Sequence, residues 1–134
     1  MSKINYKLLI IIWLSIILIL SSLSGNTLNK IPIVKIPYLD KIVHFSMYFI
    51  LQFLFMNDYF FSKKYNNFKR YLFLSFLFTL SYGSLMEILQ QYVFIKRSGD
   101  FFDFLANASG AITAIIFVLL FYNKIFNKKF KKSN

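Results

Sequence analysis

Cysteine is absent from this sequence of 134 residues, which also has few acidic residues, two prolines and a single histidine. Without cysteine, disulfide bonds and thiolate metal sites are excluded. One histidine with scattered carboxylates has no diagnostic ligand spacing, so we expect no metal site and no cofactor. Both prolines, Pro32 and Pro37, fall in one connecting segment, which we expect to be an extended loop because each disfavours helix in the preceding residue.

Apolar residues dominate the composition: 57% are hydrophobic and 21% aromatic. That fraction exceeds what a soluble domain of this size normally carries. A bilayer span needs about 20 mostly apolar residues. Four segments meet or approach this length, namely Tyr6–Leu23, Val43–Phe61, Tyr71–Phe94 and Phe101–Tyr122. We therefore predict an all-α fold, a four-helix transmembrane bundle that forms a single domain over residues 1–134. A cleaved secretion signal is the alternative interpretation of the first segment, because basic residues precede it and small residues follow it.

The formal net charge of +11 raises the question of nucleic-acid binding, but the positions of the basic residues argue against it. Eleven of the 16 Lys and Arg residues lie in the N-terminal leader, in the second connection and in a basic tail over residues 124–134. In a four-span protein these segments share one side. The positive-inside bias then predicts cytoplasmic N and C termini in the cytoplasmic (inner) membrane. We expect membrane lipids as partners and no nucleic acid.

Four of the five acidic residues lie beside or within the apolar segments, toward their predicted outer ends, and only Asp58 lies elsewhere. A carboxylate near hydrocarbon is costly and usually faces a protein interior or a wet cavity. At 1.5 Å of rise per residue, His44 lies roughly 6 Å, and Glu87 and Asn107 each roughly 10 Å, inside their helix ends. Three helices thus carry polar groups in one layer.

This layer predicts a single polar pocket facing outward. Its expected members are Asp40, Lys41, His44, Glu87, Gln90, Arg97, Asp103 and Asn107. Arg97 and Lys41 could grip a carboxylate or phosphate, and His44 could pass a proton. The same residues also have plainer roles. Asp40 suits a helix cap, Asp100 and Asp103 suit a capping box, and Gln90 and Asn107 suit hydrogen bonds between helices. We also expect Gly99 to adopt a positive φ in a tight turn.

The pattern resembles the VanZ-like family of small bacterial membrane proteins. The elements that carry the resemblance are Asp40-Lys41-Ile42-Val43-His44-Phe45 with Tyr48, then Glu87-Ile88-Leu89-Gln90, then Arg97, Asp103, Asn107 and Gly110. Their order and spacing agree over about Leu23 to Ala114. The serine pair Ser21-Ser22 lacks the closely following proline that the family often has. The resemblance implies a multi-pass protein of the cell envelope, in a family whose named member is associated with resistance to the glycopeptide teicoplanin.

Together these features predict a membrane protein whose pocket binds or acts on an envelope component, with a lipid-linked or phosphate-bearing ligand suited to Arg97 and Lys41. Two alternatives stay open. The first is an integral membrane hydrolase or transferase that uses His44 and Glu87 as acid and base. The second is a structural or assembly protein in which the polar groups only lock the helices together.

Overall fold

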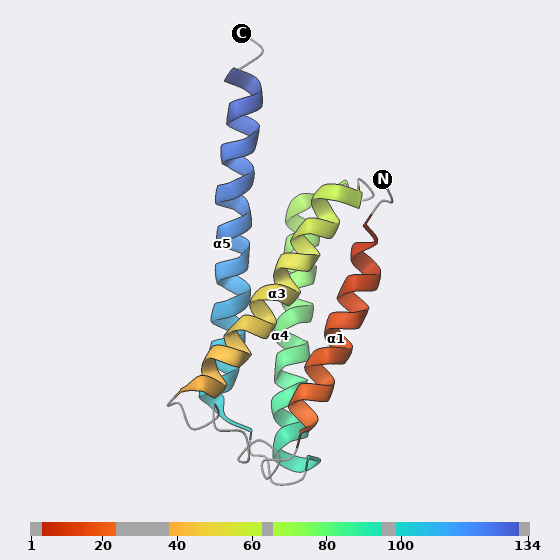
Figure 1. Cartoon of the computed structure of the whole chain (residues 1–134), viewed down its shortest axis with the longest axis vertical. Coiled ribbons are helices and arrows are strands. Elements are labelled where there is room, and N and C mark those ends of the chain that lie inside the picture. Colours follow the sequence, from red (N-terminus) through yellow and green to blue (C-terminus); the bar gives the residue numbers. More distant parts are fainter. Residues whose placement is uncertain (1–3, 24–37, 63–65, 95–98, 132–134) are drawn as a thin grey trace.

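A computed structural model describes residues 4–23, 38–62, 66–94 and 99–131, with residues 122–131 described as backbone only. The described chain is helical. Its four helices are α1 (Tyr6–Ser22), α3 (Leu39–Ser62), α4 (Phe68–Tyr92) and α5 (Phe101–Lys131). Figure 1 shows them as a bundle in which α1 begins, and α5 ends, toward the same end of the molecule. The predicted all-α class is therefore confirmed.

Three of the helices are long and apolar enough to cross a membrane, over Leu39–Phe61, Phe68–Tyr92 and Phe101–Phe121. The fourth, α1, is apolar but has only 17 residues, which corresponds to about 25 Å of helix against a hydrocarbon core of about 30 Å. The helix bounds differ from the predicted spans by three residues or fewer except in two places. Helix α3 begins four residues earlier than expected, and α5 continues through most of the basic segment that we predicted as a tail.

Side-chain caps explain where several helices start. The Asn5 side chain accepts the Leu8 backbone N–H at 3.3 Å, and that of Asn67 accepts the Arg70 N–H at 3.0 Å. At the start of α5, Asp100 Oδ1 accepts the Phe102 N–H at 2.9 Å, so the predicted cap at Asp100 is present. An orphan N–H satisfied in this way stabilises a helix by about 1 kcal/mol. Asp40 differs from our prediction because it lies within the first turn of α3 rather than before it.

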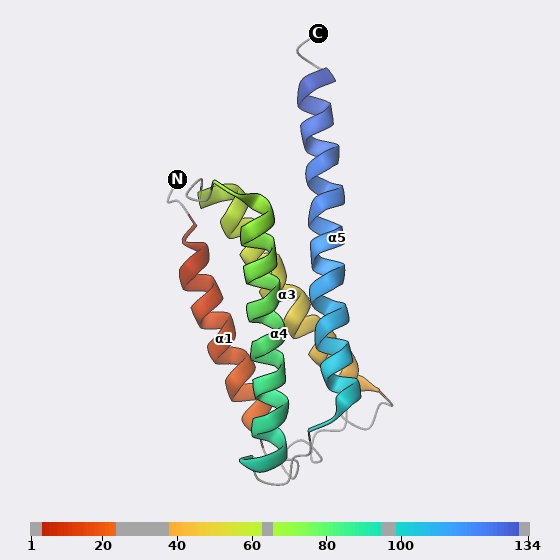
Figure 2. The same ribbon diagram turned by 180° about the vertical axis from the view of Figure 1, so that it is seen from behind.

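Helices α3 and α5 share the most extensive contact between helices. In Figure 2, α3 passes behind α4, and α5 lies beside α4. Small residues make this approach possible, since Ala111 and Ala114 are fully buried. A methyl group at Gly110 would overlap the carbonyl of Phe45 on α3. Close approach of backbones through small residues is how helices associate where no water drives them together.

Helix α1 packs on α3 and α4 through a cluster of buried apolar residues that includes Ile10, Ile17 and Met86. Hydrogen bonds also hold α1 against these helices. Trp13 Nε1 donates to the Met47 carbonyl at 2.9 Å, and the Tyr82 hydroxyl donates to the Leu14 carbonyl at 2.8 Å. These bonds fix the position of α1 along the axes of α3 and α4.

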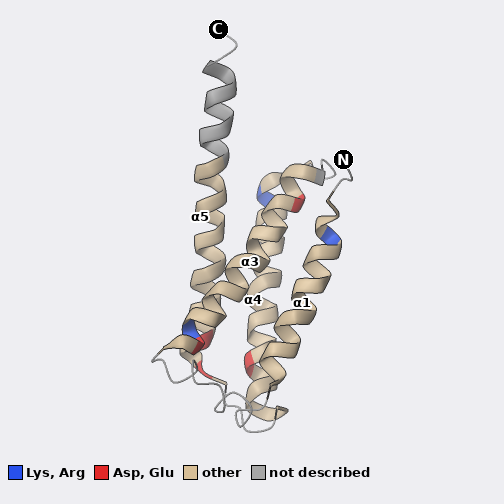
Figure 3. Cartoon of the chain, in the orientation of Figure 1, with Lys and Arg blue, Asp and Glu red and all other residues tan. Residues whose placement is uncertain are grey.

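The middle of the bundle holds no charged residue, and the described charges gather near the two ends of the helices (Figure 3). Three of the buried polar side chains between the ends, Gln52, Ser75 and Thr79, are neutral and hydrogen-bonded to one another. The Gln52 side chain, fully buried on α3, donates to Ser75 at 3.2 Å and accepts from Thr79 at 2.8 Å, both on α4. This distribution suits a bilayer, where charge is tolerated near the interfaces and buried polar groups need partners.

Candidate functional site

The candidate site lies at the end of the bundle where α3 and α5 begin and α4 ends. Lys41 is at its rim. Its ammonium lies 2.9 Å from Asp40, 2.9 Å from Asp100 and 2.7 Å from Asp103. The Lys41 side chain is 27% exposed, so water still reaches this network. One cation therefore joins the first turn of α3 to that of α5, and we name Lys41 with these three aspartates the lysine network.

The structure corrects the predicted capping box. In that motif Asp103 would accept the backbone N–H of Asp100. Instead the Asp100 N–H donates to Glu87 Oε2 on α4 at 3.1 Å, and Asp103 turns toward Lys41. The Phe102 backbone N–H, together with Lys41, holds the pKa of the Asp100 carboxyl below its ordinary value of 3.8. The helix start is thus bound to two neighbouring helices and is not a self-contained cap.

Glu87 links the polar groups of α4 and α5. One oxygen accepts the Asp100 backbone N–H, and the other accepts from the Asn107 amide at 3.4 Å. The Glu87 side chain is only 11% exposed. The nearest basic side chain that the structure describes is His44, whose Nδ1 lies 3.6 Å from Glu87 Oε1. Of the cations expected to serve Glu87, Lys41 is bonded elsewhere, and Arg97 lies outside the described residues.

His44 is held by an amide that determines its tautomer. Because Asn107 Nδ2 donates to Glu87, Asn107 Oδ1 faces His44 Nδ1 at 3.1 Å. An amide oxygen can only accept, so this arrangement assigns a hydrogen to Nδ1. His44 Nε2 then faces Asp103 Oδ2 at 3.8 Å.

Tyr48, one turn deeper than His44, completes the layer. The residue is 1% exposed, and within the described part of the chain its hydroxyl has no hydrogen-bond partner. The ring stands against Gly83 of α4, where a Cβ would lie 3.2 Å from Tyr48 Cε1 and 3.3 Å from the Asn107 amide nitrogen. Gly83 thus leaves room for both side chains. A buried hydroxyl without a partner is costly and marks a place where a ligand atom or water would be stabilised.

A groove of about 420 Å³ leads to Glu87 from the outside of the bundle, between α4 and the start of α5. Glu87 and Asp100 supply its charged wall. Its remaining lining is mainly apolar and aromatic, with Ile88, Tyr92, Phe101 and Phe104 among the lining residues. The groove therefore combines a carboxylate wall with a surface suited to hydrocarbon.

One expected member of the pocket, Gln90, has another position, and Gly99 differs from its predicted conformation. Gln90 is 1% exposed, and its amide donates to the Ser21 carbonyl at 3.3 Å, so it ties α4 to α1. Gly99 has no positive φ, contrary to our prediction. Glycine is needed there for another reason: a Cβ would lie 2.5 Å from the Glu87 carbonyl oxygen. The neighbouring Gln91 accepts the Gly99 N–H at 3.0 Å, a contact between loop and helix that the sequence pattern did not predict.

The same cluster contains three side chains grouped closely enough that they could hold a metal ion. His44, Glu87 and Asp103 each offer one ligand atom, and these atoms lie within 4.8 Å of one another. Asp103 also gives its other oxygen to Lys41, whose charge opposes a second cation. The cluster as described is organised around a lysine and an imidazole.

Comparison with protein-family models, with curated proteins and with solved structures gives no match to this chain. The class of protein that fold and site define is a helical protein with three helices suited to crossing a membrane and a buried carboxylate–imidazole cluster at one end.

Proposed function

We propose that this chain is a VanZ-like protein of the bacterial cytoplasmic membrane, and that its polar pocket binds a lipid-linked component of the cell envelope. In this proposal α1 is a fourth span, both termini are cytoplasmic, and the pocket faces outward. The family resemblance and the bias of basic residues toward the other side support the topology. A role in teicoplanin resistance belongs to the same proposal.

The observation that carries the proposal is that Glu87 belongs both to the buried polar layer and to the wall of the groove. Its side chain contacts His44 and Asn107 in the buried layer, and the same residue forms a wall of the groove that opens outward. A carboxylate that only locked helices together would have no reason to line an opening. The apolar residues of that groove suit the hydrocarbon part of a lipid-linked molecule.

Charge indicates which polar group the pocket would hold. The described cluster has four acidic side chains against Lys41 and His44, so acidic groups outnumber basic groups. It therefore favours a ligand that presents amines or hydroxyls over one that presents a bare phosphate. A phosphate-bearing ligand, which we expected from the sequence, would depend on Arg97.

A specific contact favours a second candidate, the membrane hydrolase or transferase. His44 and Glu87 lie within 3.6 Å, close enough to exchange a proton through a substrate hydroxyl or one water. The tautomer assigned by Asn107 leaves Nε2 toward Asp103, and Glu87 is the group that reaches the groove. In this mechanism Glu87 would accept the proton of the attacking hydroxyl or water, and His44 would stabilise the charge.

The test compares Glu87→Gln and His44→Gln with Asp58→Asn, which changes a buried carboxylate at the opposite end of the bundle. Membrane abundance, the melting temperature in detergent and teicoplanin susceptibility of expressing cells are measured for each. We expect both site variants to lose the envelope phenotype at normal abundance, while Asp58→Asn keeps it. Unchanged phenotypes in both site variants would contradict the proposal.

The same variants separate the candidates. If the cluster only locks helices, Glu87→Gln lowers the melting temperature, and phenotype follows abundance. If the protein is an enzyme, both variants still retain the copurified envelope lipid in native mass spectrometry, but they lose its turnover. If the pocket only binds, retention of that lipid falls in Glu87→Gln, and no conversion is seen in the wild type.

A further inference from the structure

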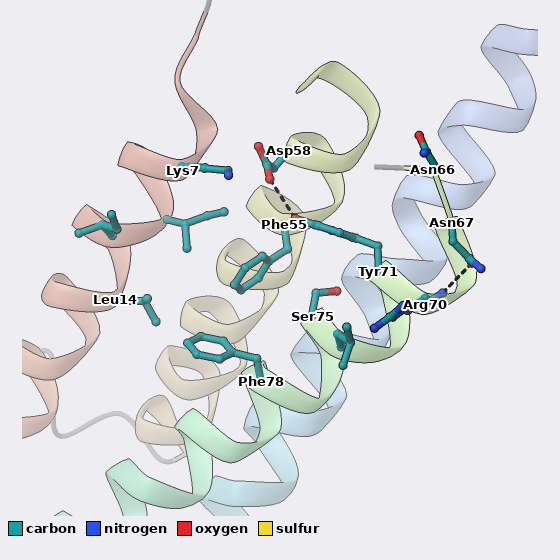
Figure 4. Close-up of a pocket in the computed structure, with 13 residues that line it drawn as sticks. Lys7, Leu14, Phe55, Asp58, Asn66, Asn67, Arg70, Tyr71, Ser75 and Phe78 are labelled. Atoms are coloured by element: carbon teal, nitrogen blue, oxygen red, sulfur yellow. Dashed lines mark hydrogen bonds between the residues drawn. The ribbon is translucent and has the colours of Figure 1, made fainter. Parts of the chain in front are cut away.

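A larger cavity, of about 760 Å³, opens at the opposite end of the bundle, where α1 and α4 begin. Figure 4 shows its lining side chains, which come from α1, α3 and α4. We name it the basic groove and define it by Lys7, Leu14, Phe55, Arg70, Leu74 and Phe78. It shares no lining residue with the groove at Glu87.

Polarity is sorted along the length of the basic groove. Lys7 and Arg70 lie in the first turns of α1 and α4, on opposite sides of the opening (Figure 4). Deeper along the same helices the lining becomes apolar, with Leu14 on α1 and Phe78 on α4. From Arg70 to Phe78 the helix rises about 12 Å. A groove charged at one end and apolar over such a length matches an amphiphile, with its charge at the helix ends.

The charge of the opening is positive. Its one carboxylate, Asp58, is 3% exposed and accepts a hydrogen bond from the Tyr71 hydroxyl at 3.0 Å. Two cationic side chains, Lys7 and Arg70, line the same cavity, so basic groups outnumber acidic groups among its described lining residues. Arg70 is exposed, and no carboxylate of the described residues forms an ion pair with its guanidinium. The guanidinium is thus available to a ligand from outside the chain.

We propose that the basic groove binds an anionic phospholipid of the surrounding bilayer, with its phosphate at Arg70, an acyl chain along Leu14, Leu74 and Phe78, and Lys7 adding positive charge at the opening. Arginine binds phosphate through two parallel hydrogen bonds, and basic pockets between membrane helices suit lipid head groups. Because α4 is long enough to cross a membrane, its first turn lies near an interface, where such head groups are found. This proposal does not depend on the function proposed for the carboxylate cluster.

Native mass spectrometry of the full chain in detergent tests this, with phosphatidylglycerol and phosphatidylcholine of identical acyl chains as probes. We expect the wild type to retain phosphatidylglycerol in preference. Arg70→Gln should lower its affinity about fivefold, the effect of roughly one basic residue at a membrane surface. Lys69→Gln is the matched control, because Lys69 is an exposed neighbour that does not line the groove.

A second pair of variants tests whether the acyl chain lies along the apolar lining of the basic groove. Leu74→Trp fills the groove and should reduce retention of both lipids, whereas Leu77→Trp, at a similarly exposed position that does not line it, should not. Equal losses in Arg70→Gln and Lys69→Gln would overturn the proposal in favour of diffuse attraction to a basic surface. Equal binding of free glycerol phosphate, or no preference between the two lipids, would overturn it as well. Arg70→Lys, which keeps the charge, should retain most of the preference.

Discussion

His44 Nδ1 on α3 lies 3.1 Å from Asn107 Oδ1 on α5, and this contact decides which atoms of the imidazole face the carboxylates. Both residues are almost fully buried, at 5% and 1% exposure. Asn107 is itself oriented by the bond that it donates to Glu87. A single amide thus relates the side chains of three helices, and the contact supports the first prediction.

Asn107→Leu should lower the free energy of unfolding by about 1–3 kcal/mol, because it leaves a buried imidazole N–H without an acceptor. The melting temperature in detergent measures this. Ser109→Ala is the control, since Ser109 is exposed and bonds only to its own helix, and it should change stability by less than about 0.5 kcal/mol. Equal stability of Asn107→Leu and the wild type would show that the imidazole does not depend on this amide.

Lys41→Met should destabilise the protein by about 1–3 kcal/mol at neutral pH, because three carboxylates lose their shared cation. The value is below that of a fully buried pair because Lys41 is partly exposed to water.

The pH dependence of this variant has a defined sign. The pKa of Asp100 is held below its ordinary value of 3.8, so its contribution to stability is present above that pH and is lost as pH falls through the folded-state pKa. The gap between wild type and Lys41→Met should therefore narrow below about pH 4, as the carboxylates become protonated. Melting temperatures between pH 3 and pH 8, on the pH scale of these groups, measure it. A gap that is constant with pH would contradict the lysine network.

Gly110→Ala should cost about 1–3 kcal/mol, although alanine favours helix over glycine by about 1 kcal/mol. The added methyl would meet the rigid backbone of Phe45, so α3 and α5 would have to separate. Gly83→Ala provides the comparison. Its methyl would meet only side-chain atoms of Tyr48 and Asn107, at 3.2 Å or more, and these can shift. Melting temperatures should place Gly110→Ala clearly below Gly83→Ala, and the reverse order would contradict the close approach at Gly110.

The natural absence of cysteine allows a direct test of the proposed topology, since any introduced cysteine is the only one. Asn66 and Tyr92 are exposed and lie at opposite ends of α4. With both termini cytoplasmic, Tyr92→Cys should react with a membrane-impermeant maleimide in intact cells, and Asn66→Cys only after permeabilisation. The opposite labelling pattern would invert the topology and place the carboxylate cluster on the cytoplasmic side.

Local pattern was sufficient for the helices and for the depth of the polar residues. Hydropathy placed the four helices, and their spacing put His44, Glu87 and Asn107 in one layer, where the structure brings them together. These features depend on local hydropathy and on the helical repeat, and both can be read from residues that are close together in the chain. The cap at Asp100 was predictable for the same reason, because it forms within one turn of chain.

The choice of partner was not predictable from the sequence. Lys41 pairs with Asp100 and Asp103, about 60 residues away, because α3 and α5 cross with their first turns in contact. Gln90 shares a helix with Glu87 but turns to Ser21 of α1. The basic groove went unpredicted, since its walls come from helices that the sequence separates widely.

The sequence alone determined a set of apolar helices that carry costly polar groups near their ends. The reason is that hydropathy and helical periodicity are set by residues close together in the chain. Which of those groups meet was decided only by the tertiary structure, because a hydrogen bond or ion pair between helices depends on the angle, height and rotation at which they pack. Those quantities are fixed by close contacts such as Gly110 against Phe45, between residues that are distant in the chain.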